Sequence, residues 1–177
     1  MKKFLAVLSL ALSVNSLAQA YGLDKDQEGL IVGAGAVGGF EFHQLKRPEG
    51  GLATQLGYRF NQNLTVFLET DVAYTKKDGV HYFFIPVMPT VQYFVYQGAY
   101  VYAGGGYEFV RASEGSQFGV NAFARNYNAW AGDGGAGYEF WLDNNLTVAP
   151  QLGFHYTRIS HSNLYTPNVR VNIAYHF

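Results

Sequence analysis

Apolar and polar residues alternate one by one along most of this sequence from residue 30 onward. In the segment 51–60, every large apolar side chain falls on one face, and the opposite face carries Gly51, Ala53, Gln55, Gly57 and Arg59. Successive side chains of a β-strand point to opposite faces, so a period of two predicts strands that are apolar on one side only. The chain must therefore cover one apolar sheet face along nearly its whole length.

Repeated along the chain, this alternation predicts eight strands, at 30–43, 51–60, 64–74, 83–95, 99–109, 129–142, 146–157 and 167–177. Each is about as long as, or slightly longer than, the 9–11 residues with which a tilted strand crosses a bilayer. Three connections are tight turns and four are long, at 43–50, 75–82, 110–128 and 158–166. Short turns at one end and long loops at the other are typical of outer-membrane barrels. Prolines within the predicted strands lead us to expect bulges or irregular pairing at Pro86, Pro89 and Pro150.

Aromatic residues gather at both ends of the predicted apolar face. Those at the turn ends are Tyr58, Phe60, Tyr93, Phe140, Tyr175 and Phe177, and those at the loop ends are Phe40, Phe42, Tyr74, Phe83, Tyr107, Phe109, Trp130, Phe154 and Tyr156. A soluble β-sandwich has the same alternation, but two aromatic girdles around an aliphatic band indicate a barrel in a membrane. We predict an all-β fold, an eight-stranded antiparallel up-and-down transmembrane β-barrel, with both termini in the periplasm and the long loops outside.

The amino-terminal residues 1–20 differ from the rest: a basic start precedes an apolar run, and Ala18-Gln19-Ala20 provides a small-residue cleavage site. This arrangement predicts a secretory signal peptide. We expect residues 21–29 to form a periplasmic lead-in and residues 30–177 to form the barrel. The chain has no cysteine, so an exported protein of this size has to fold without disulfides. A net charge of −1 does not indicate a nucleic-acid partner.

Charged residues also occur on the inward face of the predicted strands. We expect a lumen polar network of Glu41, Arg59, Glu69, Asp71, Glu108, Asp133, Glu139 and Arg170, because small barrels are filled by side chains that bond to one another and to trapped water. Since the last strand must close against the first, Glu41 and Arg170 are expected to form one ion pair. A pair of carboxylates acting as general acid and base is the alternative interpretation.

Basic residues concentrate in the long connections. Candidate lipopolysaccharide contacts are Lys46, Arg47, Lys76, Lys77, Arg111, Arg125 and Arg158, with Glu49, Asp78 and Glu114 as the acids of the same connections. Phosphate groups of lipopolysaccharide are natural counter-ions for such a rim. Solvated loop charges without a ligand are the simpler alternative.

Two motifs suggest other functions. Residues 31–38 contain G-x-G-x-x-G after an apolar run, which is the dinucleotide fingerprint, but no helix pattern follows it. We expect these glycines to leave space inside the barrel for larger inward side chains. His161-Ser162-Asn163 resembles part of the lipid A deacylases, which would imply a nucleophile and a base. In that family the His and Ser are two residues apart and an acid follows, whereas here His161 and Ser162 are adjacent and no acid follows.

Over residues 21–177 the sequence resembles the OmpA/OmpX-type and opacity-type small outer-membrane barrels. The resemblance rests on Gly57-Tyr58-Arg59-Phe60 before an Asn-containing turn, Ile85-Pro86-Val87, Gly104-Gly105-Gly106-Tyr107 and the final Val171–Phe177 segment. It implies an assembly signal, with aromatics at Tyr175 and Phe177, that is read by the barrel-assembly machinery. Asn172 stands where the family usually has Gly.

These observations predict a cell outer-membrane protein of Gram-negative type with a structural or surface-interaction role. That role would be envelope integrity, or contact with lipopolysaccharide, a ligand or a host surface through basic extracellular loops. We predict no enzymatic activity and no catalytic, cofactor-binding or metal-binding residues. The expected partners are outer-membrane lipid, lipopolysaccharide and the assembly machinery, and the expected state is a monomer. A lipid A-modifying acyl hydrolase and a narrow pore are the alternatives.

Overall fold

The described part of the chain consists mainly of long β-strands that follow one another in the sequence. A computed structural model describes residues 28–42, 46–114, 124–159 and 162–177. Its strands are β1 (Gly29–Glu41), β2 (Arg47–Asn61), β3 (Leu64–Lys77), β4 (Val80–Tyr96), β5 (Ala99–Glu114), β6 (Ala124–Tyr138), β7 (Phe140–Trp141), β8 (Leu146–Ile159) and β9 (Ser162–His176). No helix within the described ranges has the length and hydropathy that crossing a membrane requires.

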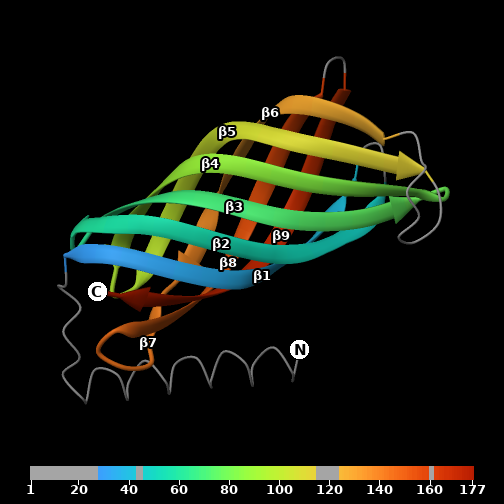
Figure 1. Ribbon diagram of the computed structural model, residues 1–177. Coiled ribbons are helices and arrows are strands. Elements are labelled where there is room, and N and C mark those ends of the chain that lie inside the picture. The colour runs from blue at the N-terminus through green and yellow to red at the C-terminus, as the bar shows by residue number, and fades with distance from the viewer. Residues whose placement is uncertain (1–27, 43–45, 115–123, 160–161) are drawn as a thin grey trace.

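Each strand pairs antiparallel with its neighbours, and the sheet closes on itself (Figure 1). The last strand pairs with the first, from Ile31 opposite His176 to Gly39 opposite Asn168. Strand β6 pairs with β8 as well as with β5. Closure gives the first and last strands a partner on both sides, so neither is a free sheet edge.

Strands β6 and β7 are two parts of one barrel strand. Gly137 lies opposite Gln151, and Phe140 lies opposite Val148, so the register against β8 is the same on both sides of the gap. The interruption falls at Tyr138 and Glu139, across from Pro150, which has no backbone donor. The barrel therefore has eight strands, and the predicted fold class is confirmed.

The other two strand prolines interrupt the ladders without shifting them. Pro86 pairs with Glu108 of β5 but is missing from the β3 ladder, whereas Pro89 pairs with Leu68 of β3 but is missing from the β5 ladder. Because proline lacks an N–H, each loses pairing on one side only. The irregular pairing expected at these positions is present, but bulges are not; the register shifts instead at the turns, between Arg59 and Asn61 and between Phe94 and Tyr96.

The connections at the end away from the carboxyl terminus are shorter than predicted. We call this the loop end, and the opposite one, which carries Phe177, the turn end. Strands β3 and β4 stay paired up to Lys77 and Val80, so the predicted loop 75–82 is a two-residue hairpin. Asp78 and Gly79 have φ of 50° and 84°. Two consecutive positive φ angles match the twist of the flanking strands, and Asp-Gly favours them.

The outer wall of the barrel is apolar. Leu52 and Leu152 are 70% and 67% exposed, whereas inward Ile31 and Met88 are 1% and 0% exposed. Most of the girdle residues at both ends are also exposed, including Tyr58 and Phe60 at the turn end and Phe42 and Trp130 at the loop end. A sandwich would have buried these side chains, so this wall is built to contact lipid.

Both polar and apolar side chains fill the interior of the barrel. Three small apolar clusters lie inside, formed by Ile31, Phe67 and Ala174, by Phe94, Tyr100, Tyr102 and Ala149, and by Ala73, Phe84, Val110 and Leu164. The inward glycines of β1 make room for neighbours: a Cβ at Gly35 would overlap the Asn172 side chain, which donates to Gln55 at 3.2 Å. Gly33 and Gly35 thus leave room for the larger inward side chains of neighbouring strands, as expected from the sequence.

Candidate functional site

The buried charges of the lumen form the most distinctive chemical feature of the barrel. All eight residues assigned to the lumen polar network are buried, namely Glu41, Arg59, Glu69, Asp71, Glu108, Asp133, Glu139 and Arg170. They lie at three levels along the axis, with one arginine at the turn end, one near the middle and carboxylates toward the loop end. Burial of a charge is costly unless it is paired, so the pairing at each level decides what the site can do.

Arg170 of β9 organises the middle level. Its guanidinium lies 2.6 Å from Asp71 Oδ2, 3.3 Å from Glu69 Oε1 and 3.4 Å from Asp133 Oδ2. Thr90 donates to the second oxygen of Glu69 at 2.8 Å. One cation therefore contacts three carboxyl groups from β3 and β6.

Arg59 of β2 closes the turn end. Its Nη2 donates to both oxygens of Glu139, at 2.7 and 2.9 Å, and its Nε donates to Thr65 at 3.4 Å. The guanidinium also lies 4.7 Å from the ring centre of Phe94 and 5.6 Å from that of Trp141. This pair is matched in charge, and its guanidinium lies beside two aromatic rings that add cation–π attraction.

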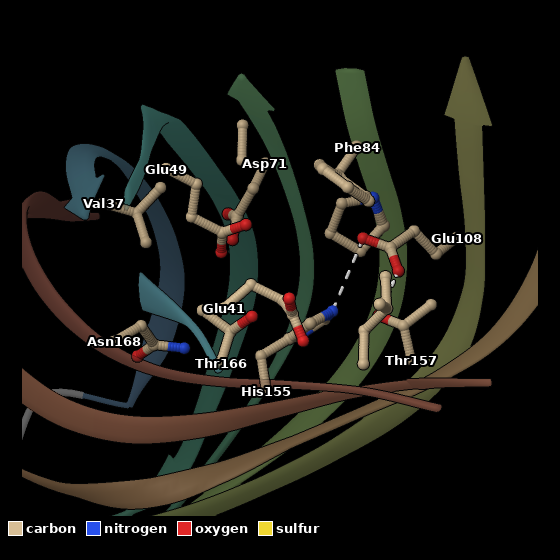
Figure 2. A pocket seen from close by; sticks show the side chains of 13 residues that line it. Val37, Glu41, Glu49, Asp71, Phe84, Glu108, His155, Thr157, Thr166 and Asn168 are labelled. Atoms are coloured by element: carbon tan, nitrogen blue, oxygen red, sulfur yellow. Dashed lines mark hydrogen bonds and ion pairs between the residues drawn. The ribbon is translucent and has the colours of Figure 1, made fainter. Parts of the chain in front are cut away.

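A small pocket lies near the loop end (Figure 2), with a volume of about 30 Å³. Glu41, Glu49, Asp71, Glu108 and His155 contribute its titratable side chains. His155 Nε2 lies 3.5 Å from one oxygen of Glu108, and the Thr157 hydroxyl donates to the other. Acids therefore outnumber bases among the described residues that line this pocket.

Two expectations about the charged residues need correction. The expected Glu41–Arg170 pair does not form: Arg170 lies opposite Val37, and Glu41 is four residues, or about 13 Å, further along β1. Glu41 instead accepts a hydrogen bond from the Lys46 backbone at 3.2 Å. Glu49, interpreted as a loop acid, belongs to β2, where it is half-buried and points into the pocket.

The alternation itself could have placed Glu49. Inward residues of β2 are odd-numbered, so extending the strand by two residues puts Glu49 beside Gly51 on the lumen face. The same parity places Trp141, which is 4% exposed, inside with Glu139. The prediction missed Glu49 because the expected strand began only at Gly51. It missed Trp141 because this residue was not assigned to a face of its strand.

The residues predicted to contact lipopolysaccharide lie at different positions of the barrel. Lys76, Arg111 and Arg158 are exposed on the outward face of β3, β5 and β8, and Lys46 and Arg47 are exposed at the start of β2. Lys77 is half-buried and has interactions of its own. The Arg125 side chain and His161 lie outside what the structure describes, and of Ser162 only the backbone, at the start of β9, is described.

The final residues of the chain lie at the seam of the barrel. Tyr175 and Phe177 are 45% and 64% exposed, with their ring centres 4.8 Å apart. The Phe177 amide donates to the Leu30 carbonyl at 2.9 Å. These aromatic rings therefore face lipid, while the backbone completes the closure between β9 and β1.

Several solved structures share this fold. Ail, the attachment invasion locus protein of Yersinia pestis, in complex with the heparin analogue sucrose octasulfate, has a TM-score of 0.64 at 15% identity, over 85% of this chain and 100% of that one. Neisserial surface protein A has 0.63 at 17% identity, over 84% and 97%. The amino-terminal barrel of Pseudomonas aeruginosa OprF has 0.53 at 14% identity, over 84% and 100%. The sequence matches no protein-family profile and no curated protein sequence.

The closed sheet, the apolar wall and these likenesses define the class of the protein. It is a small eight-stranded β-barrel of the outer-membrane type. At these identities the likeness shows the fold alone, so the role of the chain has to be argued from its own side chains.

Proposed function

We propose that the protein is a surface-interaction barrel of the outer membrane, with its loop end outside, and that it contacts phosphate groups of lipopolysaccharide through cationic side chains. One observation carries this proposal. Lys76, Arg111 and Arg158 are exposed on the outward face of the wall, next to the aromatic girdle of the loop end.

The positions of these cations suit a headgroup layer. Arg111 lies opposite Phe83 across the β4–β5 ladder, and Lys76 follows Tyr74 on the same face of β3. Arg158 lies opposite Trp130 across the β6–β8 ladder. Aromatic girdles mark the boundary between hydrocarbon and headgroups, so cations beside them lie at the depth of the phosphates.

If the basic side chains of the loop end were only solvated charges without a ligand, they would show no preference for the outward face of the barrel. The three cations point sideways, along the direction of the lipid-facing aromatic residues, and not into the barrel mouth. The complex of Ail with a sulfated saccharide concerns that protein, but it supports a multiply charged anion as a ligand class for this fold. Arginine and lysine bind phosphate and sulfate through charge-assisted hydrogen bonds.

The test compares two variants of equal net charge. In the first, Lys76→Gln, Arg111→Gln and Arg158→Gln remove three positive charges at the loop end. In the second, Gln62→Glu, Gln97→Glu and Asn144→Asp add three negative charges at exposed turn-end positions. Binding of purified barrels to lipopolysaccharide and to its dephosphorylated form is then measured in detergent.

We expect the first variant to bind phosphorylated lipopolysaccharide at least about tenfold more weakly than wild type, which corresponds to the loss of about 1.4 kcal/mol. The turn-end variant should bind like wild type, and the dephosphorylated lipid should bind weakly to all three proteins. Equal weakening in both variants would show that only overall charge matters and would refute the proposed contact.

A further inference from the structure

A histidine lies between two of the cations on the outer wall. His81 is half-buried on the outward face of β4, directly opposite Lys76 on β3. On its other side it lies opposite Ser113 of β5, two residues from Arg111 on the same face. Residues directly opposite each other on neighbouring strands have Cβ atoms about 5 Å apart, and diagonal neighbours remain within reach of long side chains. Lys76 and Arg111 therefore flank His81 from the two adjacent strands.

The imidazole of His81 is held by a neighbouring aromatic residue. The Tyr74 hydroxyl lies 2.7 Å from Nδ1 of His81, and the two ring centres are 5.8 Å apart. Tyr74 in turn packs against Phe83 in the girdle of the loop end, with ring centres 5.2 Å apart. These contacts restrict the orientation of the imidazole.

The hydrogen bond at Nδ1 determines what the other ring nitrogen offers. With Tyr74 as the donor, a neutral imidazole carries its own proton on Nε2, and a protonated imidazole carries one there as well. The two ring nitrogens point in different directions, so Nε2 is directed away from the Tyr74 hydroxyl. His81 then presents an N–H donor between an ammonium group and a guanidinium group.

The charge on this part of the wall favours an anion. Lys76 and Arg111 belong to strands about 10 Å apart, with only β4 between them. The outward residues of β4 at this level are His81 and Phe83, and neither is an acid. Asp78 is exposed at the tip of the hairpin, two residues beyond Lys76, so the described residues of this area carry two cations against one acid. A phosphate group accepts several charge-assisted hydrogen bonds and can be shared by donors from all three strands.

We propose that Lys76, His81 and Arg111 form a single phosphate-binding site across β3, β4 and β5. In this site His81 donates from Nε2, and Tyr74 is a positioning residue that donates to Nδ1. The inference rests on the proposed contact with lipopolysaccharide phosphate and makes it more specific. Arg158 lies on β8, two strands beyond β5, and does not belong to this site.

The experiment measures binding of refolded barrels in detergent to lipopolysaccharide and to its dephosphorylated form. His81→Phe keeps a ring but removes both nitrogens, and it leaves every lysine and arginine in place. His81→Gln returns an amide donor to the same position. Tyr74→Phe removes the hydroxyl that positions the imidazole. Tyr107→Phe is the matched control, because it removes a hydroxyl from the same girdle on β5.

We expect His81→Phe to bind the phosphorylated lipid about five- to tenfold more weakly than wild type, since a hydrogen bond to a charged group is lost. His81→Gln should bind with an intermediate affinity, and Tyr107→Phe should bind like wild type. Tyr74→Phe should weaken binding about two- to threefold when His81 is present and should have no effect in the His81→Phe background, because Tyr74 acts through His81. Faster gel migration of the unheated form verifies that each variant is folded.

The imidazole nitrogens provide a readout that packing alone would not change. The ¹⁵N resonance of His81 Nε2 is assigned by its absence from His81→Phe. It should shift when phosphorylated lipopolysaccharide is added and stay in place when the dephosphorylated form is added.

The outcomes separate this inference from the proposed function. If the triple substitution of Lys76, Arg111 and Arg158 weakens binding but His81→Phe binds like wild type, the cations act without the histidine and only this inference is overturned. An equal effect of Tyr74→Phe in both backgrounds would overturn the positioning role of Tyr74. If wild type binds both lipid forms equally, the proposed function and this inference are both refuted.

Discussion

Arg170 is the residue on which the charge balance of the middle lumen depends. It is 2% exposed and contacts carboxylates on two other strands. Truncating one partner of a buried ion pair leaves the other charge without compensation, and here three acids would be left. Arg170 therefore contributes mainly by preventing repulsion among Glu69, Asp71 and Asp133.

We predict that Arg170→Gln lowers the free energy of unfolding by about 3–5 kcal/mol, the usual cost of breaking a buried pair. Urea titration of the refolded barrel in detergent measures the change. Adding Asp71→Asn should recover part of the loss, because it removes one of the stranded charges. Adding Asp143→Asn, at an exposed turn, is the control and should recover nothing. Equal recovery by both second substitutions would contradict this account.

At the scale of the element, β1 has two different faces. Inward Gly35 lies against the Asn172 side chain and the β9 backbone, whereas the nearest atom to a Cβ on outward Gly38 is 3.9 Å away. The close packing at Gly35 brings β1 and β9 together at the closing seam. The two glycines therefore differ in cost of substitution although they are three residues apart.

We expect Gly35→Ala to destabilise the barrel by about 1–3 kcal/mol through overpacking. Gly38→Ala should change stability by less than about 0.5 kcal/mol, as is usual for surface positions. Both changes add one methyl group to β1, so any general effect of alanine on the strand cancels. Similar midpoints for the two variants in urea would argue against a tightly packed seam.

The strands could be predicted because the alternation depends only on the order of residues. Their loop ends could not: β2 begins at Arg47, four residues before the predicted start, and its extension brought Glu49 into the lumen. The Asp78-Gly79 turn carried a recognisable signal that the reading of 75–82 as a long loop overlooked. Which acid meets Arg170 depends on side-chain reach across the lumen, and no pattern along one strand encodes it.

At the scale of the whole molecule, the turn end offers a matched pair of aromatic residues for testing the proposed assembly signal. Tyr58–Phe60 and Tyr175–Phe177 have ring centres 5.1 and 4.8 Å apart with interplanar angles of 64° and 68°. Phe60 and Phe177 are 50% and 64% exposed. Their packing is similar, but only Phe177 belongs to the carboxyl-terminal segment.

We predict that Phe177→Ala reduces the amount of barrel assembled in cell membranes while leaving refolding in detergent unchanged. Phe60→Ala should reduce neither, since both rings face lipid and contribute little to the interior. Assembly is followed by the faster gel migration of the unheated, folded form. If Phe177→Ala impaired refolding as strongly as assembly, Phe177 would act through packing and not through recognition.

The pairing of β1 with β9 has a consequence for the order of events in folding. Ile31 meets His176 across the seam, so the first strand, which pairs early with β2, finds its second partner only after nearly the entire remaining chain has been made. Until then two strands carry free backbone donors and acceptors, which hydrocarbon cannot satisfy. Loss of the last few residues would open this seam at the turn end, where Ile31 meets His176, however well the other strands pair.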